Sequence, residues 1–243
     1  MRYTKQVSSA QPAELPHGMS GRDEARGYFE WIVGLFGDAL RGDVLDHGAG
    51  TGMLAERLAA RKNHVIALEP EAVLFDGLKE RFATTPNVTL VHGTIDDYLA
   101  RYGERSLDAV VSSNVLEHLE DDVGCMRQIQ RALRPGGALA VYVPARAELF
   151  GSLDECVGHV RRYSRPLLQA RLEEAGFFVQ WVRYGNLAGV VPWLVSGRVL
   201  KRRSIPGHSL KLFDRFVLPV ASRVESLLRI PYGLNVAALA RRQ

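Results

Sequence analysis

The chain is 243 residues long and carries a formal net charge of +4, with 47% hydrophobic and 24% charged residues. This composition excludes a disordered, collagen-like or disulfide-stapled protein. A chain of this length can bury one sizeable core, so a single domain is expected, and neither a metal nor a disulfide is needed for folding.

Cysteine usage and the apolar runs of the chain indicate a compartment. Cys125 and Cys156 form no framework and no C-x-x-C spacing, so we expect a reducing compartment and no metal site. The first residues lack the apolar segment of a secretory signal, and the longest apolar runs fall short of the ~20 residues that span a bilayer. We therefore expect a cytoplasmic protein without a transmembrane helix.

The positive charge is concentrated at one end of the chain. Residues 186–243 contain ten Lys or Arg against two Asp or Glu, whereas residues 1–185 contain 21 against 25. A nucleic-acid-binding protein would place its positive groups along the face that follows the phosphates. This distribution does not favour a nucleic-acid partner.

Hydrophobic periodicity predicts the elements in chain order. Residues 1–20 are predicted to form a flexible arm, and residues 21–243 a single domain that begins with an amphipathic helix at 23–40. Short strands then alternate with helices. Strands are expected at 44–46, 64–68, 88–92, 107–112, 138–143, 177–184 and 235–239. Helices are expected at 53–60, 72–82, 122–133 and 166–175.

This alternation predicts an α/β fold with a parallel sheet covered on both faces. Residues 134–137, with the sequence Arg-Pro-Gly-Gly, predict a helix stop followed by a turn. Residues 186–231 depart from the rhythm, with two helical stretches at 187–202 and 208–229. We expect this insertion to form a helical cap before the last strand.

The most informative segment joins a predicted strand to a helix through alternate glycines. Residues 46–52 read Asp-His-Gly-Ala-Gly-Thr-Gly, and glycine lets a nucleotide-like ligand approach the backbone closely. A dinucleotide fingerprint requires glycine or alanine where Met53 stands, and no lysine follows to make a P-loop. The spacing therefore disfavours an NAD-dependent dehydrogenase.

Two further strand ends carry groups suited to an adenosine. Glu69 ends the second predicted strand, where a carboxylate can accept both ribose hydroxyls. The third strand ends in residues 93–96, in which Ile95 can pack on an adenine and Asp96 can accept its amine. Three adjacent strand ends are thus predicted to form one adenosine site.

With these residues in order, the chain resembles the class I S-adenosylmethionine-dependent methyltransferases. The family's acid-x-Gly-x-Gly-x-Gly motif matches residues 46–52, and its ribose-binding acid and adenine segment match Glu69 and residues 93–96. The resemblance extends over residues 25–184. It implies a Rossmann-like three-layer αβα sandwich with a seven-stranded, mostly parallel sheet whose last strand, at 235–239, is antiparallel.

The resemblance also implies S-adenosylmethionine as cofactor, with S-adenosylhomocysteine as its product. Asp46 is implied to bond toward the methionine part, although an aspartate here could instead cap the helix. The implied cofactor-binding residues are Asp46, Gly48, Ala49, Gly50, Gly52, Glu69, Pro70, Thr94, Ile95, Asp96, Asn114 and Val115. His47 departs from the family, which usually has an aliphatic residue there, and is expected to change the packing under the turn.

Residues for the acceptor side are expected after the fourth and fifth strands. We rank His159, His118 and Tyr163, in that order, as candidate general bases. Recognition of the substrate is predicted for Asp154, Arg161 and Arg162. Structural roles are the alternative, with Asp154 paired to an arginine and Tyr163 packed in the core. The run G-H-x-R-R-Y at 158–163 is similar to a segment in small methyltransferases that act on metabolites and on glycan or lipid intermediates.

Residues 187–203 combine apolar side chains with a basic flank, a pattern typical of peripheral membrane contact. Such contact would place the protein at the inner membrane face. A lid over the site or a homodimer interface, with its charges solvated, is the favoured interpretation, and membrane contact is the alternative. A basic lid would also attract an anionic substrate.

Together these patterns predict an enzyme that transfers a methyl group from S-adenosylmethionine, by in-line displacement, to a small molecule that is lipid-linked or anionic. A non-catalytic cofactor-binding or membrane-scaffold module is the alternative from another class. A nucleic-acid methyltransferase is disfavoured because residues 113–116, Ser-Asn-Val-Leu, replace the usual Asn/Asp-Pro-Pro-aromatic motif.

Overall fold

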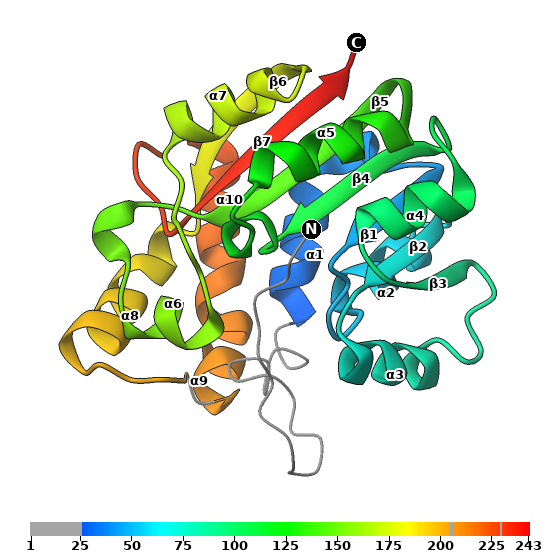
Figure 1. The fold of residues 1–243 in the computed structure, drawn as a ribbon. Coiled ribbons are helices and arrows are strands. Elements are labelled where there is room, and N and C mark those ends of the chain that lie inside the picture. The colour runs from blue at the N-terminus through cyan, green and yellow to red at the C-terminus, as the bar shows by residue number, and fades with distance from the viewer. Residues whose placement is uncertain (1–25, 205–206, 229) are drawn as a thin grey trace.

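The structure, a computed structural model, describes residues 26–204, 207–228 and 230–243, and the predicted arm at 1–20 lies outside them. One seven-stranded sheet, ordered β3-β2-β1-β4-β5-β7-β6, runs through the molecule (Figure 1). Its strands are β1 (Asp43–His47), β2 (His64–Glu69), β3 (Val88–His92), β4 (Leu107–Ser113), β5 (Leu133–Pro144), β6 (Phe177–Gly185) and β7 (Asn235–Arg242).

The sheet has the predicted topology. Strands β1 to β5 pair in parallel. Strand β7 lies between β5 and β6 and is antiparallel to both. The structure therefore confirms the seven-stranded, mostly parallel sheet and the antiparallel last strand. Because the carboxyl ends of β1 to β4 meet at one edge, the loops that follow them can form a common site.

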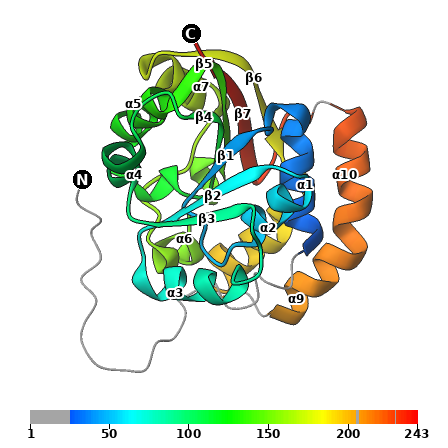
Figure 2. The same cartoon turned by 90° about the vertical axis from the view of Figure 1, so that its right-hand side faces the viewer.

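Helices cover both faces of the sheet (Figures 1 and 2). One core lies under α1 (Arg26–Phe36), α2 (Met53–Ala60) and α3 (Ala72–Arg81). The other lies under α4 (Ile95–Tyr102), α5 (Asp122–Ala132) and α7 (Arg165–Glu174). Successive strand residues point to opposite faces, so Val44 packs in the first core and Leu45 in the second.

Two short helices were not predicted, α4 and α6 (Ser152–Val157). Helix α4 begins at a capping box, in which the Thr94 N–H and hydroxyl both donate to Asp97. Residues 134–137 also differ from the prediction. Helix α5 ends at Ala132 and β5 starts at the next residue, so this segment belongs to the strand, with Gly136 at a φ of +77°.

The insertion before β7 is helical in its described part. It contains α8 (Val190–Leu194), α9 (Gly207–Leu212) and α10 (Leu218–Leu227), with π-helical turns at Val195–Val199 and Phe213–Val217. Helix α10 lies beside α1 (Figure 2). The Asp214 carboxylate accepts hydrogen bonds from the N–H groups of Gly27 and Tyr28, at 2.9 and 2.7 Å, and so attaches the insertion to the start of α1.

Among the described helices, none combines the length and apolar character needed to cross a membrane.

Candidate active site

The glycine turn after β1 adopts backbone conformations that favour glycine. Gly48, Gly50 and Gly52 have φ values of +73°, +59° and +83°. A Cβ at Gly48 would lie 2.5 Å from Val115, and one at Gly52 would lie 2.7 Å from Phe82. Larger residues would therefore be both strained and obstructed, and the turn exposes bare backbone at the sheet edge.

Asp46 lies beneath this turn at the end of β1. It is only 2% exposed, and its Oδ2 atom has no hydrogen-bond partner among the described residues. Burial, together with the nearby charge of Glu69, raises the pKa of Asp46 to about 7. A buried carboxylate oxygen without a partner is costly, so this atom is suited to receive a cationic or hydrogen-bond-donating group of a ligand.

Glu69 connects the ends of β1 and β2. Its Oε2 accepts the N–H of Gly50 at 2.8 Å, and its Oε1 accepts the N–H of Glu71 at 2.9 Å. Burial raises the pKa of Glu69, against the effect of these two hydrogen bonds. The carboxylate is thus held beside the glycine turn. Each of its oxygens has capacity for a further donor, as the predicted contact with two ribose hydroxyls requires.

The adenine segment is only partly as expected. Thr94 caps α4 and Asp96 is exposed on its first turn. Ile95, in contrast, is 1% exposed and belongs to the core under α4. The side chain of Ile95 thus packs into the protein core in this structure, and its contact with an adenine stays a prediction. Pro70 follows Glu69, and its carbonyl lies 3.2 Å from Nε2 of His92.

Asn114 and Val115 bring the end of β4 to the same place. Asn114 adopts a φ of +55°, and its N–H donates to the Tyr142 carbonyl at 2.8 Å. Asparagine tolerates this left-handed conformation better than most residues. Val115 packs against the bare face of Gly48. The ends of β1, β2 and β4 thus converge around the turn, while the N–H groups of Gly48 and Ala49 are engaged by the Leu68 carbonyl.

His47 is buried under the turn and links three elements. Its Nδ1 lies 3.1 Å from the Ser112 hydroxyl on β4, and its Nε2 lies 3.8 Å from the Cys125 sulfur on α5. Burial lowers the pKa of His47 to about 4. The imidazole is therefore a neutral packing group, in line with the expected change of packing.

In the connection between β5 and α7, a buried ion pair between Asp154 and Arg162 positions the neighbouring side chains. Arg162 donates to both oxygens of Asp154, at 2.8 and 3.1 Å, and both side chains are buried. The Asp154 carboxylate also lies 2.7 Å from Nδ1 of His159. Burial would raise the pKa of Asp154, but the bonds with His159 and Arg162 lower it. Asp154 and Arg162 were predicted to contact substrate. In this structure both are buried and hold His159 in place, as the structural alternative for Asp154 expected, and a contact with substrate stays a prediction.

Tyr163 is not suited to act as a base, contrary to its ranking. Its side chain is fully buried, and its hydroxyl donates to Asp122 at 2.7 Å. Burial and this carboxylate raise the pKa of Tyr163 well above its usual value. Arg161 pairs with the same Asp122 at 3.2 Å and donates to the Leu119 carbonyl at 2.7 Å. These contacts brace the segment between β4 and α5, and the packing of Tyr163 agrees with the structural alternative.

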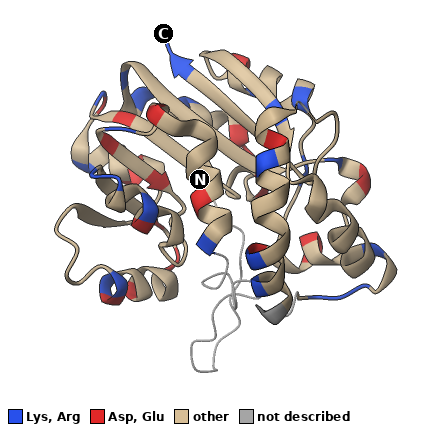
Figure 3. Cartoon of the chain, turned by 180° about the vertical axis from the view of Figure 1, so that it is seen from behind, with Lys and Arg blue, Asp and Glu red and all other residues tan. Residues whose placement is uncertain are grey.

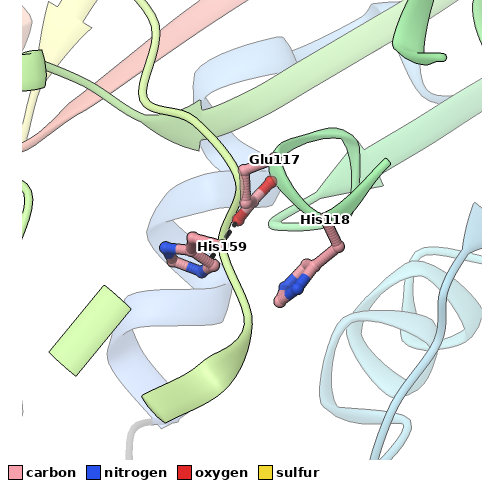
Figure 4. A group of neighbouring side chains, drawn as sticks. All are labelled: Glu117, His118 and His159. Carbon is pink, nitrogen blue, oxygen red and sulfur yellow. Dashed lines mark ion pairs between the residues drawn. The ribbon is translucent and has the colours of Figure 1, made fainter. Parts of the chain in front are cut away.

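The loop after β4 contributes a residue that the sequence analysis missed. The 3-10 turn Leu116–His118 places Glu117 beside the two histidines (Figure 4). Glu117 is fully buried, and its Oε1 lies 3.6 Å from Nε2 of His159. The rings of His118 and His159 meet edge to face, with centroids 4.8 Å apart. The only available signal was the adjacency of Glu117 to His118, which reads equally well as the start of a helix.

The comparisons with known proteins agree with this geometry. Residues 45–141 match the sequence model of a family described as "Methyltransferase domain". Over these residues the chain is therefore similar to methyltransferase domains. A Mycolicibacterium smegmatis protein named "Probable S-adenosylmethionine-dependent methyltransferase" is 31% identical over 140 residues, which cover 57% of this chain and 52% of that protein. The chain thus spans about half the length of this curated relative.

Solved structures show that known proteins share the fold of nearly the whole chain. A SAM-dependent methyltransferase from Archaeoglobus fulgidus aligns with a TM-score of 0.61 at 17% identity, over 90% of this chain and 94% of that one. Phosphoethanolamine N-methyltransferase 2 from Haemonchus contortus, in complex with S-adenosylmethionine, aligns with a TM-score of 0.60 at 18% identity, over 89% and 52%. Together the comparisons support the class I S-adenosylmethionine-dependent methyltransferase family.

Proposed function

We propose that the protein is an enzyme that transfers a methyl group from S-adenosylmethionine to a small molecule. The observation that carries this proposal is the buried Asp46 carboxylate beneath a bare glycine turn, whose Oδ2 has no hydrogen-bond partner in the described part of the chain. S-adenosylmethionine supplies an ammonium group that would neutralise this carboxylate. The match of residues 45–141 to a methyltransferase domain supports the same cofactor.

The residues present fit the other parts of this cofactor. Glu69 would accept the ribose hydroxyls, since each oxygen of its held carboxylate retains acceptor capacity. Asp96 is exposed at the start of α4, where it would accept the adenine amine. Asn114 and Val115 would line the side toward the reactive methyl group. The bound cofactor supplies an activated methyl on a sulfonium, so the chain's own task is alignment, which can lower a barrier by up to about 7–11 kcal/mol.

The acceptor side is formed by His159 and His118. The Asp154 carboxylate accepts a hydrogen bond from Nδ1–H of His159, which leaves Nε2 as the nitrogen that can accept a proton. A base positioned in this way contributes perhaps 10²- to 10⁴-fold when the acceptor is a hydroxyl or an amine. His159→Ala is expected to retain cofactor binding and lose turnover. Full activity in this variant would remove His159 from the site.

Cofactor binding is the first test. Calorimetric titration with S-adenosylmethionine should give micromolar affinity, and Glu69→Ala should abolish it, because the variant removes the ribose acceptor. Asp76→Ala serves as control, since Asp76 lies on the outer surface of α3 and pairs with Lys79. Unchanged affinity in Glu69→Ala would defeat the assignment of the cofactor site.

We further propose that the acceptor is lipid-linked or anionic and that the insertion contacts a membrane surface. Large apolar side chains are exposed there, with Val199 68% and Leu227 84% accessible. Basic residues alternate with them, and three lie together at 201–203 between α8 and α9 (Figure 3). An apolar face with a basic flank is what binding to anionic lipid requires.

Flotation with vesicles tests this surface. The chain should float with vesicles that contain anionic phospholipid, and Val199→Asp should reduce the floated fraction. Binding should also weaken at high salt, because the basic flank contributes. If the chain does not float and light scattering instead gives a dimer that Val199→Asp dissociates, the insertion is a homodimer interface and the membrane proposal fails.

A further inference from the structure

The strongest unassigned feature is the group formed by Glu117, His118 and His159. Each offers one ligand atom, and these three atoms lie within 4.8 Å of one another. We propose that they bind one divalent transition-metal ion of the zinc, cobalt or iron class. Metal binding stands on the cluster alone; a role for the ion on the acceptor side rests on the proposed function.

The donor set is one that such ions prefer. Two imidazoles and one carboxylate, with a fourth position left to water or substrate, form a recurrent zinc site in enzymes, and imidazole also suits iron and copper. Atoms that share a tetrahedral zinc lie about 3.3 Å apart, given metal–ligand distances of about 2.0 to 2.1 Å. Glu117 Oε1 and His159 Nε2 are already 3.6 Å apart. Small side-chain rotations would therefore complete the shell.

The surroundings of the two imidazoles also fit metal ligands. Metal-binding histidines almost always donate their second ring N–H to a carboxylate or a carbonyl. Nδ1 of His159 faces the Asp154 carboxylate at 2.7 Å, and Nδ1 of His118 faces the Gly158 carbonyl at 3.2 Å. Because both oxygens can only accept, these contacts place the proton on Nδ1 of each ring. Nε2 then carries the lone pair that a metal requires.

Asp154 is itself held firmly. Its oxygens accept two bonds from Arg162 and one from the Gly151 N–H at 3.0 Å. Such outer contacts fix the orientation of a metal-binding imidazole. This role explains why an aspartate and an arginine, predicted to touch substrate, are instead buried behind His159.

The charge of Glu117 points the same way. This carboxylate is fully buried in the 3-10 turn after β4, and burial of an anion costs less free energy beside a cation. A divalent ion between Glu117 and the two neutral imidazoles would provide that charge. His118 is half-buried, so the open position of the ion would face the side from which an acceptor approaches.

The position of the cluster links it to the proposed reaction. Glu117 and His118 follow Val115, which packs against the glycine turn. An ion here would lie on the acceptor side, where it could hold an acceptor oxygen or nitrogen and lower its pKa. His159 Nε2 would then act as a ligand instead of accepting the proton itself.

Cobalt is the probe for the experiment. Untagged, chelator-treated protein is titrated with Co²⁺ and followed by visible absorption and by calorimetry. The expected result is one Co²⁺ per chain with the d–d bands of a low-coordinate site. Glu117→Gln and His118→Ala should each weaken binding by more than the roughly 10- to 100-fold that loss of a residue behind a ligand costs. His118→Ala covers the case in which the buried Glu117 variant fails to fold.

His64→Ala is the matched control, since His64 lies at the start of β2 and contacts Asp43 and Thr89. Absence of the cobalt bands in the wild type, unchanged affinity in His118→Ala, or an equal loss in His64→Ala would overturn the metal site. The same metal-free protein is titrated with S-adenosylmethionine. Cofactor binding without Co²⁺ binding overturns this inference alone, whereas Co²⁺ binding without cofactor binding overturns the proposed function alone.

Discussion

The two sides of the candidate site are held by different kinds of contact. On the cofactor side, backbone groups position the side chains, as when the N–H groups of Gly50 and Glu71 hold the Glu69 carboxylate. On the acceptor side, other side chains do this work, as when Arg162 and Asp154 hold His159. A site held by the backbone follows from contiguous motifs. One held by side chains depends on partners that lie far apart in the chain.

The largest expected loss of stability comes from a substitution on the acceptor side. Arg162→Ala leaves Asp154 buried without its main counter-charge, and loss of one partner of a buried pair costs about 3–5 kcal/mol. The free energy of unfolding, from urea denaturation, should fall by this amount. Arg161→Ala is the matched control, because its side chain is 21% exposed and should cost clearly less. Equal losses would mean that the buried pair does not organise this side.

Asp46→Asn tests the cofactor side with opposite effects on stability and binding. The folded pKa of Asp46, about 7, lies above the usual aspartate pKa of 3.8. Its contribution to stability is therefore present below about pH 4 and lost as the pH rises through 7. At pH 8 the variant should be more stable, by at most about 4 kcal/mol, and bind S-adenosylmethionine more weakly. Thermal unfolding and calorimetry measure both, and a less stable variant would contradict the account.

Acid stability reports on His47 under the turn. Its folded pKa of about 4 lies below the usual histidine pKa of 6.5. The unfolded chain therefore takes up the proton first, and stability should fall as the pH drops from 6.5 to about 4, by about 3 kcal/mol. His47→Gln should flatten this part of the profile. If the variant shows the same slope as the wild type, the acid sensitivity comes from other groups.

The smallest expected effect is that of Tyr163→Phe, which tests whether Tyr163 is a candidate base. Tyr163→Phe removes the hydroxyl that donates to Asp122, at a cost of about 1–3 kcal/mol. Once a substrate is known, its turnover should remain near that of the wild type, because the hydroxyl is fully buried and bonded to Asp122. A loss of turnover as large as that of His159→Ala would restore Tyr163 as a candidate base.

Most of the fold follows from local patterns. Helix α2 spans the predicted residues 53–60, and β3 spans the predicted 88–92, because periodicity and flanking turns agree in both segments. Helix α4 was missed because residues 93–96 were interpreted only as a ligand segment, although Thr94 and Asp97 form a capping box. Gly136 was expected in a turn, yet it lies in β5.

The candidate site was predictable where spacing along the chain determines position. The glycine turn and Glu69 were predicted to lie together from the order of the strands along the chain, and in the structure Glu69 accepts a hydrogen bond from Gly50. The part that could not be predicted depends on burial and on distant pairs. The side chains of Ile95 and Tyr163 are buried in the core. Glu117 lies beside His159 because the β5–α7 connection folds back onto the turn after β4.

The most direct test of the account is a crystal structure with S-adenosylhomocysteine. We predict that the nucleoside lies over the glycine turn, with both ribose hydroxyls on Glu69 and the amino group near Asp46. A structure in which the compound binds elsewhere, or in which Glu69 makes no contact with it, would contradict the central claim.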